Sequence, residues 1–144
     1  MPKVTAINIS EKKGVIKHPI PLGEFIVDWG LKDDAHGGNW HRQVSLLGQE
    51  SIDKMTAMGV QGLCTGKFAE NLTTEGIELF TLPIGTILQI HDVKLEVTQI
   101  GKECHVGCQI RQLVGDCIMP REGIFAKVLH PGTIRPGDEI TLSN

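Results

Sequence analysis

The segment from Thr86 to Gln99 constrains the fold more than any other part of the chain. In residues 93–99 (VKLEVTQ), three aliphatic residues alternate with two charged residues and a threonine. A period of two predicts a strand with one buried side and one side facing water. Residues 86–90 supply a second strand, and His91-Asp92 supplies the turn between the two. This stretch therefore predicts a β-hairpin.

The composition extends this prediction to the rest of the chain. Seventeen glycines and seven prolines favour short strands and tight turns over a helical bundle. A mainly β fold is expected, with a curled antiparallel sheet closed or half-closed into a β-barrel, because closure removes exposed strand edges. A small α+β sheet domain is the alternative. The 144 residues suit one domain, residues 1–144. Further strands are expected at 3–10, 15–17, 25–29, 43–47, 123–129 and 139–142.

Helices are expected at only one or two places. Residues 49–58 form the better candidate, with Glu50 and Lys54 as an i,i+4 pair and Gly59 to end the helix. A second short helix is expected across 106–114. Polar, glycine-bearing segments at 31–41 and 62–67 predict loops. In the last strand, Ile140 and Leu142 are expected to point inward.

Charge and hydropathy narrow the range of partners and compartments. The net charge of −3 argues against broad binding to nucleic acid or to an anionic membrane, so any anion site must be local. The N-terminal MPKVTAINIS lacks the pattern of a secretory signal, and no stretch reaches the length of a membrane span. A cytoplasmic protein with reduced cysteines is expected. Thiolate or metal chemistry is then favoured over disulfides.

Residues 98–125 form the most chemically distinctive stretch. It contains three of the four cysteines, together with one histidine and two arginines. Cations beside a thiol favour its thiolate form. Cys104 is the expected reactive thiol because it follows a strand end and lies between Lys102 and His105. Cys108 and Cys117 are candidate resolving thiols or metal co-ligands.

Two other interpretations of these cysteines remain. The spacing C-H-x2-C-x8-C supplies sulfur and nitrogen ligands of the kind that zinc prefers, although it matches none of the common zinc-finger spacings. Alternatively, the cysteines are buried and inert, which is the expectation for Cys64.

Two loops offer candidate ligand-binding residues. Asp33, Asp34, His36 and His41 could bind a divalent metal, but capping of turns is the favoured interpretation. Arg42 is a better candidate, because a guanidinium binds phosphate or an oxyanion through paired hydrogen bonds. The second loop, 67–75, contains Lys67 and the amide and hydroxyl donors of Asn71, Thr73 and Thr74. An ordinary polar turn is the alternative there.

Four ordered blocks together resemble a known family. They are DAHGGNWHRQVSLLGQESI at 34–52, KFAENLTTEGIEL at 67–79, IGTILQIHDVKLEVTQIGKECH at 84–105 and GDCIMPREGIFAKVLHPGTIRPGDEI at 115–140. In these blocks the chain resembles a small stand-alone MOSC domain, named for the C-terminal domain of molybdenum cofactor sulfurases. The resemblance is to a short bacterial subtype without the additional N-terminal domain of larger relatives. Many relatives have a proline before the cysteine, where this chain has Glu103.

The resemblance implies a β-barrel that handles sulfur or the molybdenum cofactor. Its hallmark cysteine corresponds to Cys104, as a persulfide carrier or a molybdenum ligand. We expect Lys102, His105 and Arg121 to tune or orient that thiol. The blocks with Arg42 and with Asn71, Thr73 and Thr74 border one cleft in such relatives, so these four residues are expected to bind the anionic end of a pterin phosphate or a molybdate-like oxoanion. Pyridoxal phosphate, which larger members use, is not expected here.

The resemblance also suggests partners and rival functions. The expected partners are molybdenum cofactor assembly proteins and a small anionic or pterin ligand. The first rival function is a non-catalytic carrier or scaffold for the cofactor. The second is a small reductase with molybdenum on Cys104.

Overall fold

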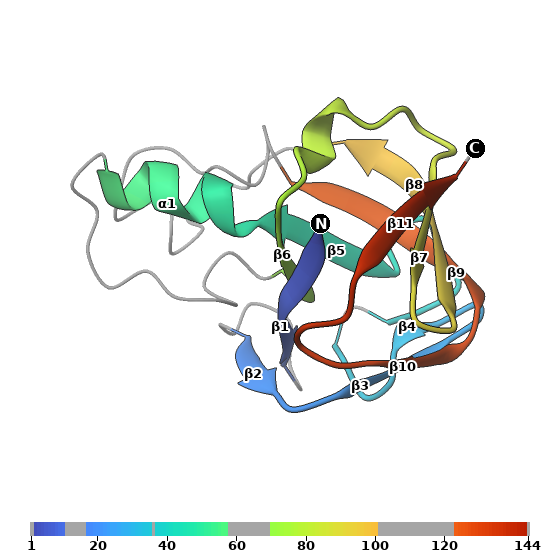
Figure 1. Cartoon of the computed structure of the whole chain (residues 1–144). Helices are drawn as coiled ribbons and strands as arrows, with labels where there is room; N and C mark the ends of the chain where they lie inside the picture. Colours follow the sequence, from blue (N-terminus) through green and yellow to red (C-terminus); the bar gives the residue numbers. More distant parts are fainter. Residues whose placement is uncertain (1, 11–16, 36, 58–69, 101–122, 144) are drawn as a thin grey trace, which may run out of the picture.

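The structure is a computed structural model that describes residues 2–10, 17–35, 37–57, 70–100 and 123–143 (Figure 1). Strands dominate this part of the chain, as the sequence predicts. The elements are β1 (Lys3–Ile9), β2 (His18–Ile20), β3 (Gly23–Ile26), β4 (Gly30–Leu31), β5 (Val44–Gly48), α1 (Gln49–Ala57), β6 (Leu72–Glu75), the 3-10 helix η1 (Leu79–Thr81), β7 (Ile87–Ile90), β8 (Val93–Ile100), β9 (Ile124–His130), β10 (Gly132–Ile134) and β11 (Ile140–Ser143).

The strands form two sheets. The larger has eight strands in the order β11-β7-β8-β9-β5-β6-β1-β2, and the smaller has the order β10-β3-β4. The pairs among the described strands are antiparallel except β5 and β6, which run parallel. The expectation of a mostly antiparallel domain is therefore confirmed, with one parallel pair in the larger sheet. Parallel neighbours need a long crossover connection, and α1 lies between β5 and β6 in the chain.

The expected barrel is not confirmed, because the described strands form two open sheets. The two ends of the larger sheet do approach each other at one point. The backbone N–H of Val4 in β1 donates to the carbonyl of Asp138, just before β11, at 2.9 Å. Lys3 and Glu139 also form an isolated antiparallel bridge. These contacts connect β1 with the approach to β11 without making the two strands continuous neighbours.

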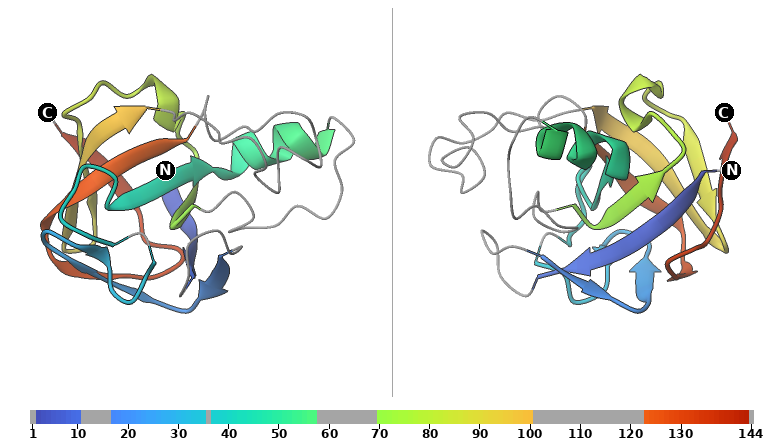
Figure 2. Two further views of the ribbon diagram at one scale, coloured as in Figure 1. Left: turned by 180° about the vertical axis from the view of Figure 1, so that it is seen from behind. Right: turned by 60° about the vertical axis from the view of Figure 1, so that its left-hand side comes forward.

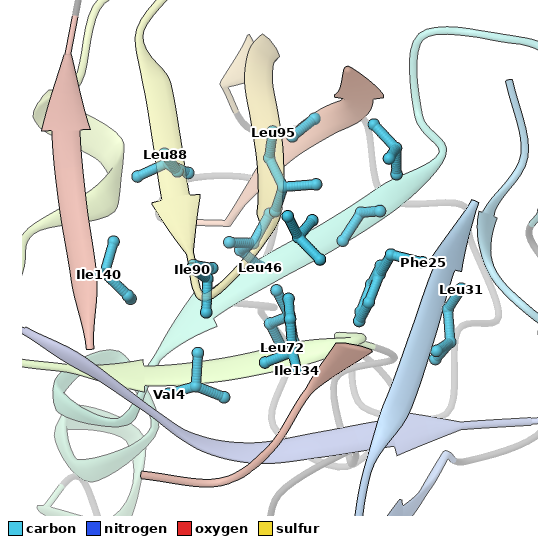
Figure 3. Packing of buried hydrophobic residues seen from close by; sticks show 14 of the residues in the cluster. Val4, Phe25, Leu31, Leu46, Leu72, Leu88, Ile90, Leu95, Ile134 and Ile140 are labelled. Atoms are coloured by element: carbon cyan, nitrogen blue, oxygen red, sulfur yellow. The ribbon is translucent and has the colours of Figure 1, made fainter. Parts of the chain in front are cut away.

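Alternating aliphatic side chains of the larger sheet form the core (Figure 3). Val93, Leu95 and Val97 of β8 are fully buried, which confirms the alternation predicted for this strand. Phe25 and Leu31 from the smaller sheet point toward Leu46 and Leu72 of the larger one in Figure 3. The core therefore lies between the two sheets.

The hairpin and the first helix are confirmed close to their predicted limits. Strands β7 and β8 pair from Ile87↔Glu96 to Ile90↔Val93 around the two-residue turn. His91 in that turn has a φ of 54°, within the left-handed region that such turns require. Helix α1 continues from the end of β5 and extends away from the sheets (Figure 2). Neither helix in the described part of the chain is long and apolar enough to cross a membrane.

Several local expectations differ from the structure. Ile140 is buried as expected, but Leu142 is 47% exposed. Leu142 pairs with the buried Leu88, yet β11 is the last strand of its sheet and no further strand covers this end. Strand β10 lies outside the strands expected from the sequence, and β4 begins the segment expected to be a loop.

A glycine fixes how closely the smaller sheet approaches β5. Gly30 in β4 has a φ of +111°, and a Cβ there would lie 2.4 Å from the carbonyl oxygen of Gln43. Both the backbone conformation and the close approach require glycine. This contact holds β4 against the residues that lead into β5, among them Arg42.

Candidate functional site

A row of residues crosses the larger sheet on the face opposite the core. Gln99 in β8 pairs with Phe125 in β9, and Phe125 pairs with Ser45 in β5. The row continues because the N–H of Asn71 donates to the carbonyl of Ser45 at 2.9 Å, and the N–H of Asn8 in β1 donates to the carbonyl of Asn71 at 2.7 Å. Since neighbouring strands lie about 4.8 Å apart, Phe125 and Asn71 are separated by about 10 Å.

Arg42 lies over the Phe125 end of this row. Its Cζ atom is 5.4 Å from the centre of the Phe125 ring and 5.8 Å from that of Trp40. Both distances fall within the range of cation–π attraction. The Arg42 Nε–H donates to Oε1 of Gln99 at 3.1 Å. The guanidinium is therefore held by two rings and one hydrogen bond, and its terminal N–H donors have no partner among the described residues.

His41 and Thr98 complete this end of the site. Nε2 of His41 lies 2.9 Å from Gln99 Oε1. Because the Arg42 Nε can only donate, the atom that faces both residues is the amide oxygen of Gln99, and His41 Nε2 must carry a hydrogen. The Thr98 hydroxyl contacts the carbonyl oxygen of His41 and, at 3.2 Å, that of Phe125. Thr98 thereby connects the loop before β5 to β9.

Asn71 forms the structural centre of the other end of the row. Its Oδ1 accepts from the backbone N–H of Ser45 at 3.0 Å and from the Ser45 hydroxyl at 3.2 Å. Its Nδ2 donates to the carbonyl of Asn8 at 3.3 Å. Asn71 is only 1% exposed. These hydrogen bonds connect β5, β6 and β1, so Asn71 fixes the relative position of three strands.

The buried carboxyl group of Glu70 adjoins Asn71. The hydroxyl of Thr73 donates to Oε2 of Glu70 at 2.9 Å and accepts from Nδ2 of Asn8 at 3.1 Å. All three residues are fully buried. Thr74, the next residue in β6, points to the opposite face because strand residues alternate. Among the described residues, its buried hydroxyl and the Oδ1 of Asn8 have no hydrogen-bond partner.

A buried ion pair supports this region from the side of β1. Nζ of Lys17 lies 2.7 Å from Oδ1 of Asp34, and both side chains are fully buried. Nζ also donates to the hydroxyl of Ser10 at 3.2 Å, and the N–H of Ser10 donates to Asp34 at 3.1 Å. Burial raises the pKa of Asp34, but the hydrogen bond and charge of Lys17, with further hydrogen bonds from Ser10 and Asn71, bring the pKa below its ordinary value. Asp34 is thus a carboxylate at neutral pH.

The structure separates the expected site residues into three groups. Arg42 contacts the rings of Trp40 and Phe125 and the amide of Gln99, whereas Asn71 and Thr73 bond within the buried polar end of the row. No contact joins Arg42 to Asn71, Thr73 or Thr74 in the described part of the chain, so their shared pocket stays a prediction. Other predicted positions lie outside the described residues; they are His36, Lys67, Lys102, Cys104, His105, Cys108, Cys117 and Arg121, together with Cys64 and the helix at 106–114.

The alternative metal site in the loop before β5 includes His36, which lies outside the described residues, so this site stays a prediction. No three His, Cys, Asp or Glu side chains gather as a possible metal site in residues 2–10, 17–35, 37–57, 70–100 and 123–143. Asp34 instead binds Lys17.

Sequence reasoning also missed the roles of Gln99, Trp40 and Phe125. An aromatic residue two positions before Arg42 was the one available signal.

Comparisons with known proteins agree on the fold. A family model described as "MOSC domain" matches residues 32–141. The YuaD protein from Bacillus subtilis has a similar structure, with a TM-score of 0.80 at 19% identity, covering 99% of this chain and 96% of that chain. YiiM from Geobacillus stearothermophilus gives a TM-score of 0.78 at 18% identity, covering 100% of this chain and 76% of that chain. YiiM from Escherichia coli gives 0.66 at 17% identity, covering 99% and 70%. None of the curated proteins searched matches the chain.

Proposed function

The chain belongs to the MOSC domain family, and from that premise we propose that it handles sulfur or a molybdenum-bearing oxyanion in molybdenum cofactor or sulfur–metal assembly. In this proposal Arg42 binds the anionic group and Cys104 is the reactive thiol. The observation that carries the proposal is the arrangement of Arg42, whose guanidinium lies near two aromatic rings and uses its Nε–H on Gln99, which leaves its terminal N–H donors without a partner among the described residues. The donors of a preoriented guanidinium match the oxygens of phosphate or molybdate.

Chain connectivity supports the pairing of Arg42 with Cys104. The segment that contains Cys104 begins directly after Ile100, the last residue of β8, and its other end joins β9 just before Ile124. Gln99 and Phe125, which hold Arg42, are the neighbours of these two end residues. Cys104 follows Ile100 by four residues, and four residues span at most about 14 Å. This limit keeps Cys104 within about 14 Å of Ile100, a distance compatible with the proposed pairing.

The residues around Arg42 suit an anionic ligand such as a pterin phosphate or molybdate. Arg42 supplies charge and paired donors, and the partly exposed Trp40 limits access of water to one face of the guanidinium. When bound, the molybdenum cofactor would supply the metal-centred redox or sulfur chemistry. As a sulfur carrier, the Cys104 thiolate would attack the outer sulfur of a persulfide donor, form a cysteine persulfide and release the donor's thiolate.

Membership of the family also suggests roles for the other predicted residues. Lys102, His105 and Arg121 would stabilise the Cys104 thiolate, since each supplies positive charge when protonated. To bind an anion, Asn71 would have to release a hydrogen that its Nδ2 donates to Asn8 or Asp34. Thr73 would have to release the hydroxyl hydrogen that it donates to Glu70. Assembly proteins of the cofactor are the proposed partners.

Molybdate binding tests the role of Arg42. Replacing Arg42 with Ala should weaken binding of molybdate by about tenfold or more, because charge-assisted hydrogen bonds are lost. Arg135→Ala is the matched control, since it removes the same charge from an exposed turn before β11. Titration calorimetry on the whole chain measures both variants. Equal affinities for the two variants would refute the assignment of Arg42.

The sulfur and metal content of the purified protein tests the role of Cys104. Protein prepared under reducing, anaerobic conditions should carry either one added sulfur, seen by intact mass, or molybdenum, seen by elemental analysis. Cys104→Ala should remove that component, whereas Cys64→Ala should retain it. If neither component is present, or if both variants retain it equally, the proposed function is wrong. Stoichiometric cofactor without turnover would instead favour a carrier, and turnover of an N-hydroxylated substrate would favour a reductase.

A further inference from the structure

Near its C-terminal end, strand β8 has one residue more than its partner β9 between two successive pairs. Val97 pairs with Ala126 and Gln99 pairs with Phe125, so Thr98 is an extra residue between two successive pairs. An extra residue of this kind is a β-bulge, which reverses the face on which all later residues of the strand lie. Bulges occur frequently next to functional sites, where they redirect a side chain.

The bulge decides the direction of Gln99. Val93, Leu95 and Val97 all point into the core, and an uninterrupted alternation would turn Gln99 into the core as well. After the bulge, Gln99 instead pairs with Phe125. Ile124 and Ala126, on either side of Phe125, belong to the core, so Phe125 and Gln99 lie on the opposite face.

On that face Gln99 determines the orientation of Arg42. Its amide oxygen accepts from the Arg42 Nε at 3.1 Å. This bond fixes the Nε edge of the planar guanidinium, and because the group is rigid it also fixes the directions of the terminal N–H donors. The same oxygen accepts from His41 Nε2 at 2.9 Å. Gln99 therefore restrains two adjacent residues of the loop before β5.

Thr98 contributes a restraint of its own. Its hydroxyl reaches the carbonyl oxygens of His41 and Phe125. The extra residue thus holds the loop that contains Arg42 against β9, while its insertion turns Gln99 toward that loop. One inserted residue accounts for both features of the arrangement.

We propose that the Thr98 bulge is the element that orients the anion-binding arginine, with Gln99 and Thr98 as positioning residues. The inference rests on the proposed function of Arg42. In this proposal Arg42 supplies the charge that attracts the anion. Gln99 orients the guanidinium so that two N–H donors of Arg42 bind one anion together. A guanidinium without this restraint keeps its charge but loses part of its paired recognition.

Gln99→Met is the first test, since methionine has a similar length but no carbonyl oxygen. With inorganic molybdate as the probe, this variant should bind about tenfold more weakly than the unmodified chain, the loss of roughly one charge-assisted hydrogen bond. The Arg42 Nε–H resonance, assigned through Arg42→Lys, should also exchange faster with water. Gln89→Met, at an exposed position of β7, is the control and should change neither quantity. If Gln99 only stabilises the fold, Gln99→Met would lower the melting temperature without selectively accelerating water exchange of the Arg42 Nε–H, and that result would overturn the inference.

Two variants of Thr98 test the bulge itself. Thr98→Val keeps the extra residue but loses the hydroxyl contacts, so it should weaken molybdate binding less than Gln99→Met, whereas deletion of Thr98 should weaken binding at least as much as Gln99→Met. If the deleted chain does not fold, the Gln99→Met result decides. The inference is overturned if Gln99→Met binds like Gln89→Met while Arg42→Ala loses binding. If Arg42→Ala also binds normally, the proposed function fails, and the inference fails with it.

Discussion

Removing the charge of Lys17 is the sharpest test of how the buried polar region is held together. The ammonium of Lys17 and the carboxylate of Asp34 are 2.7 Å apart, and both side chains are fully buried. Lys17→Met keeps much of the apolar length of the side chain but leaves the buried carboxylate without its counter-charge. The variant should therefore be strongly destabilised at neutral pH.

The magnitude follows from the burial of both partners. Breaking a buried ion pair by removing one partner costs about 3–5 kcal/mol in the free energy of unfolding. For a chain of this length, that loss corresponds to a fall in melting temperature of about 10–17 °C. The double variant Lys17→Met/Asp34→Leu removes both charges and should recover most of the loss, because an apolar pair replaces a buried ion pair at little cost.

The pH dependence identifies the carboxylate as the origin of the effect. In the unmodified chain the folded pKa of Asp34 is lowered, so its contribution to stability is present above the unfolded value of about 3.9 and is lost as the pH falls through the folded value. In Lys17→Met, burial is left as the main influence and raises the pKa of Asp34, so the variant loses stability as the pH rises above about 4. The difference between the two proteins should shrink toward low pH.

Urea unfolding between pH 3 and pH 8, followed by circular dichroism, measures this difference. The reasoning is refuted if Lys17→Met loses less than about 1 kcal/mol at pH 7, the size of an exposed ion pair. It is also refuted if the loss is the same at every pH, since a change in packing alone would not titrate.

Three further predictions concern other parts of the molecule. Gly30→Ala should destabilise the fold by more than Gly85→Ala in thermal unfolding, because both glycines have a positive φ but only Gly30 lies against a carbonyl oxygen; equal losses would contradict the steric argument. Asn71→Ala should cost about 2–3 kcal/mol in urea unfolding, since it leaves buried donors without an acceptor, and a smaller change would show that Asn71 does not connect the strands. Cys104 should be alkylated at a pH well below the free-thiol value of about 8.5 while Cys64 is not; protection of both until a chelator is added would favour a zinc site instead.

Local periodicity accounts for the parts of the fold that could be predicted. The alternation in residues 93–97 and the helical spacing after Gln49 are contained within short segments, and both elements appear close to the expected limits. Whether a strand pairs in parallel or antiparallel with its neighbour has no such local signature. The parallel pairing of β5 with β6 and the exposure of Leu142 on an edge strand depend on neighbours distant in sequence.

The described half of the candidate site was only partly predictable for a related reason. Arg42 could be proposed from its chemistry, because guanidinium groups bind anions wherever they are accessible. Gln99 could not, because the pattern VKLEVTQ gives no sign of a bulge and its alternation points to the core. Lys17 follows a polar turn, so the sequence suggests an exposed lysine side chain. Asp34 comes close to Lys17 only in the folded chain.

The sheet order has a consequence for synthesis on the ribosome. Strand β9, which begins at Ile124, lies between β5 and β8, so these two strands expose unpaired edges until the last part of the chain has emerged. Pairing of β1 with β6 is delayed as well, since the hydrogen bond from Thr5 to Thr73 spans 68 residues. Long-range pairing of this kind slows folding, and open strand edges invite association with other chains. The nascent protein therefore exposes edges that can associate with other chains until its C-terminal strands insert and join the two halves of the sheet.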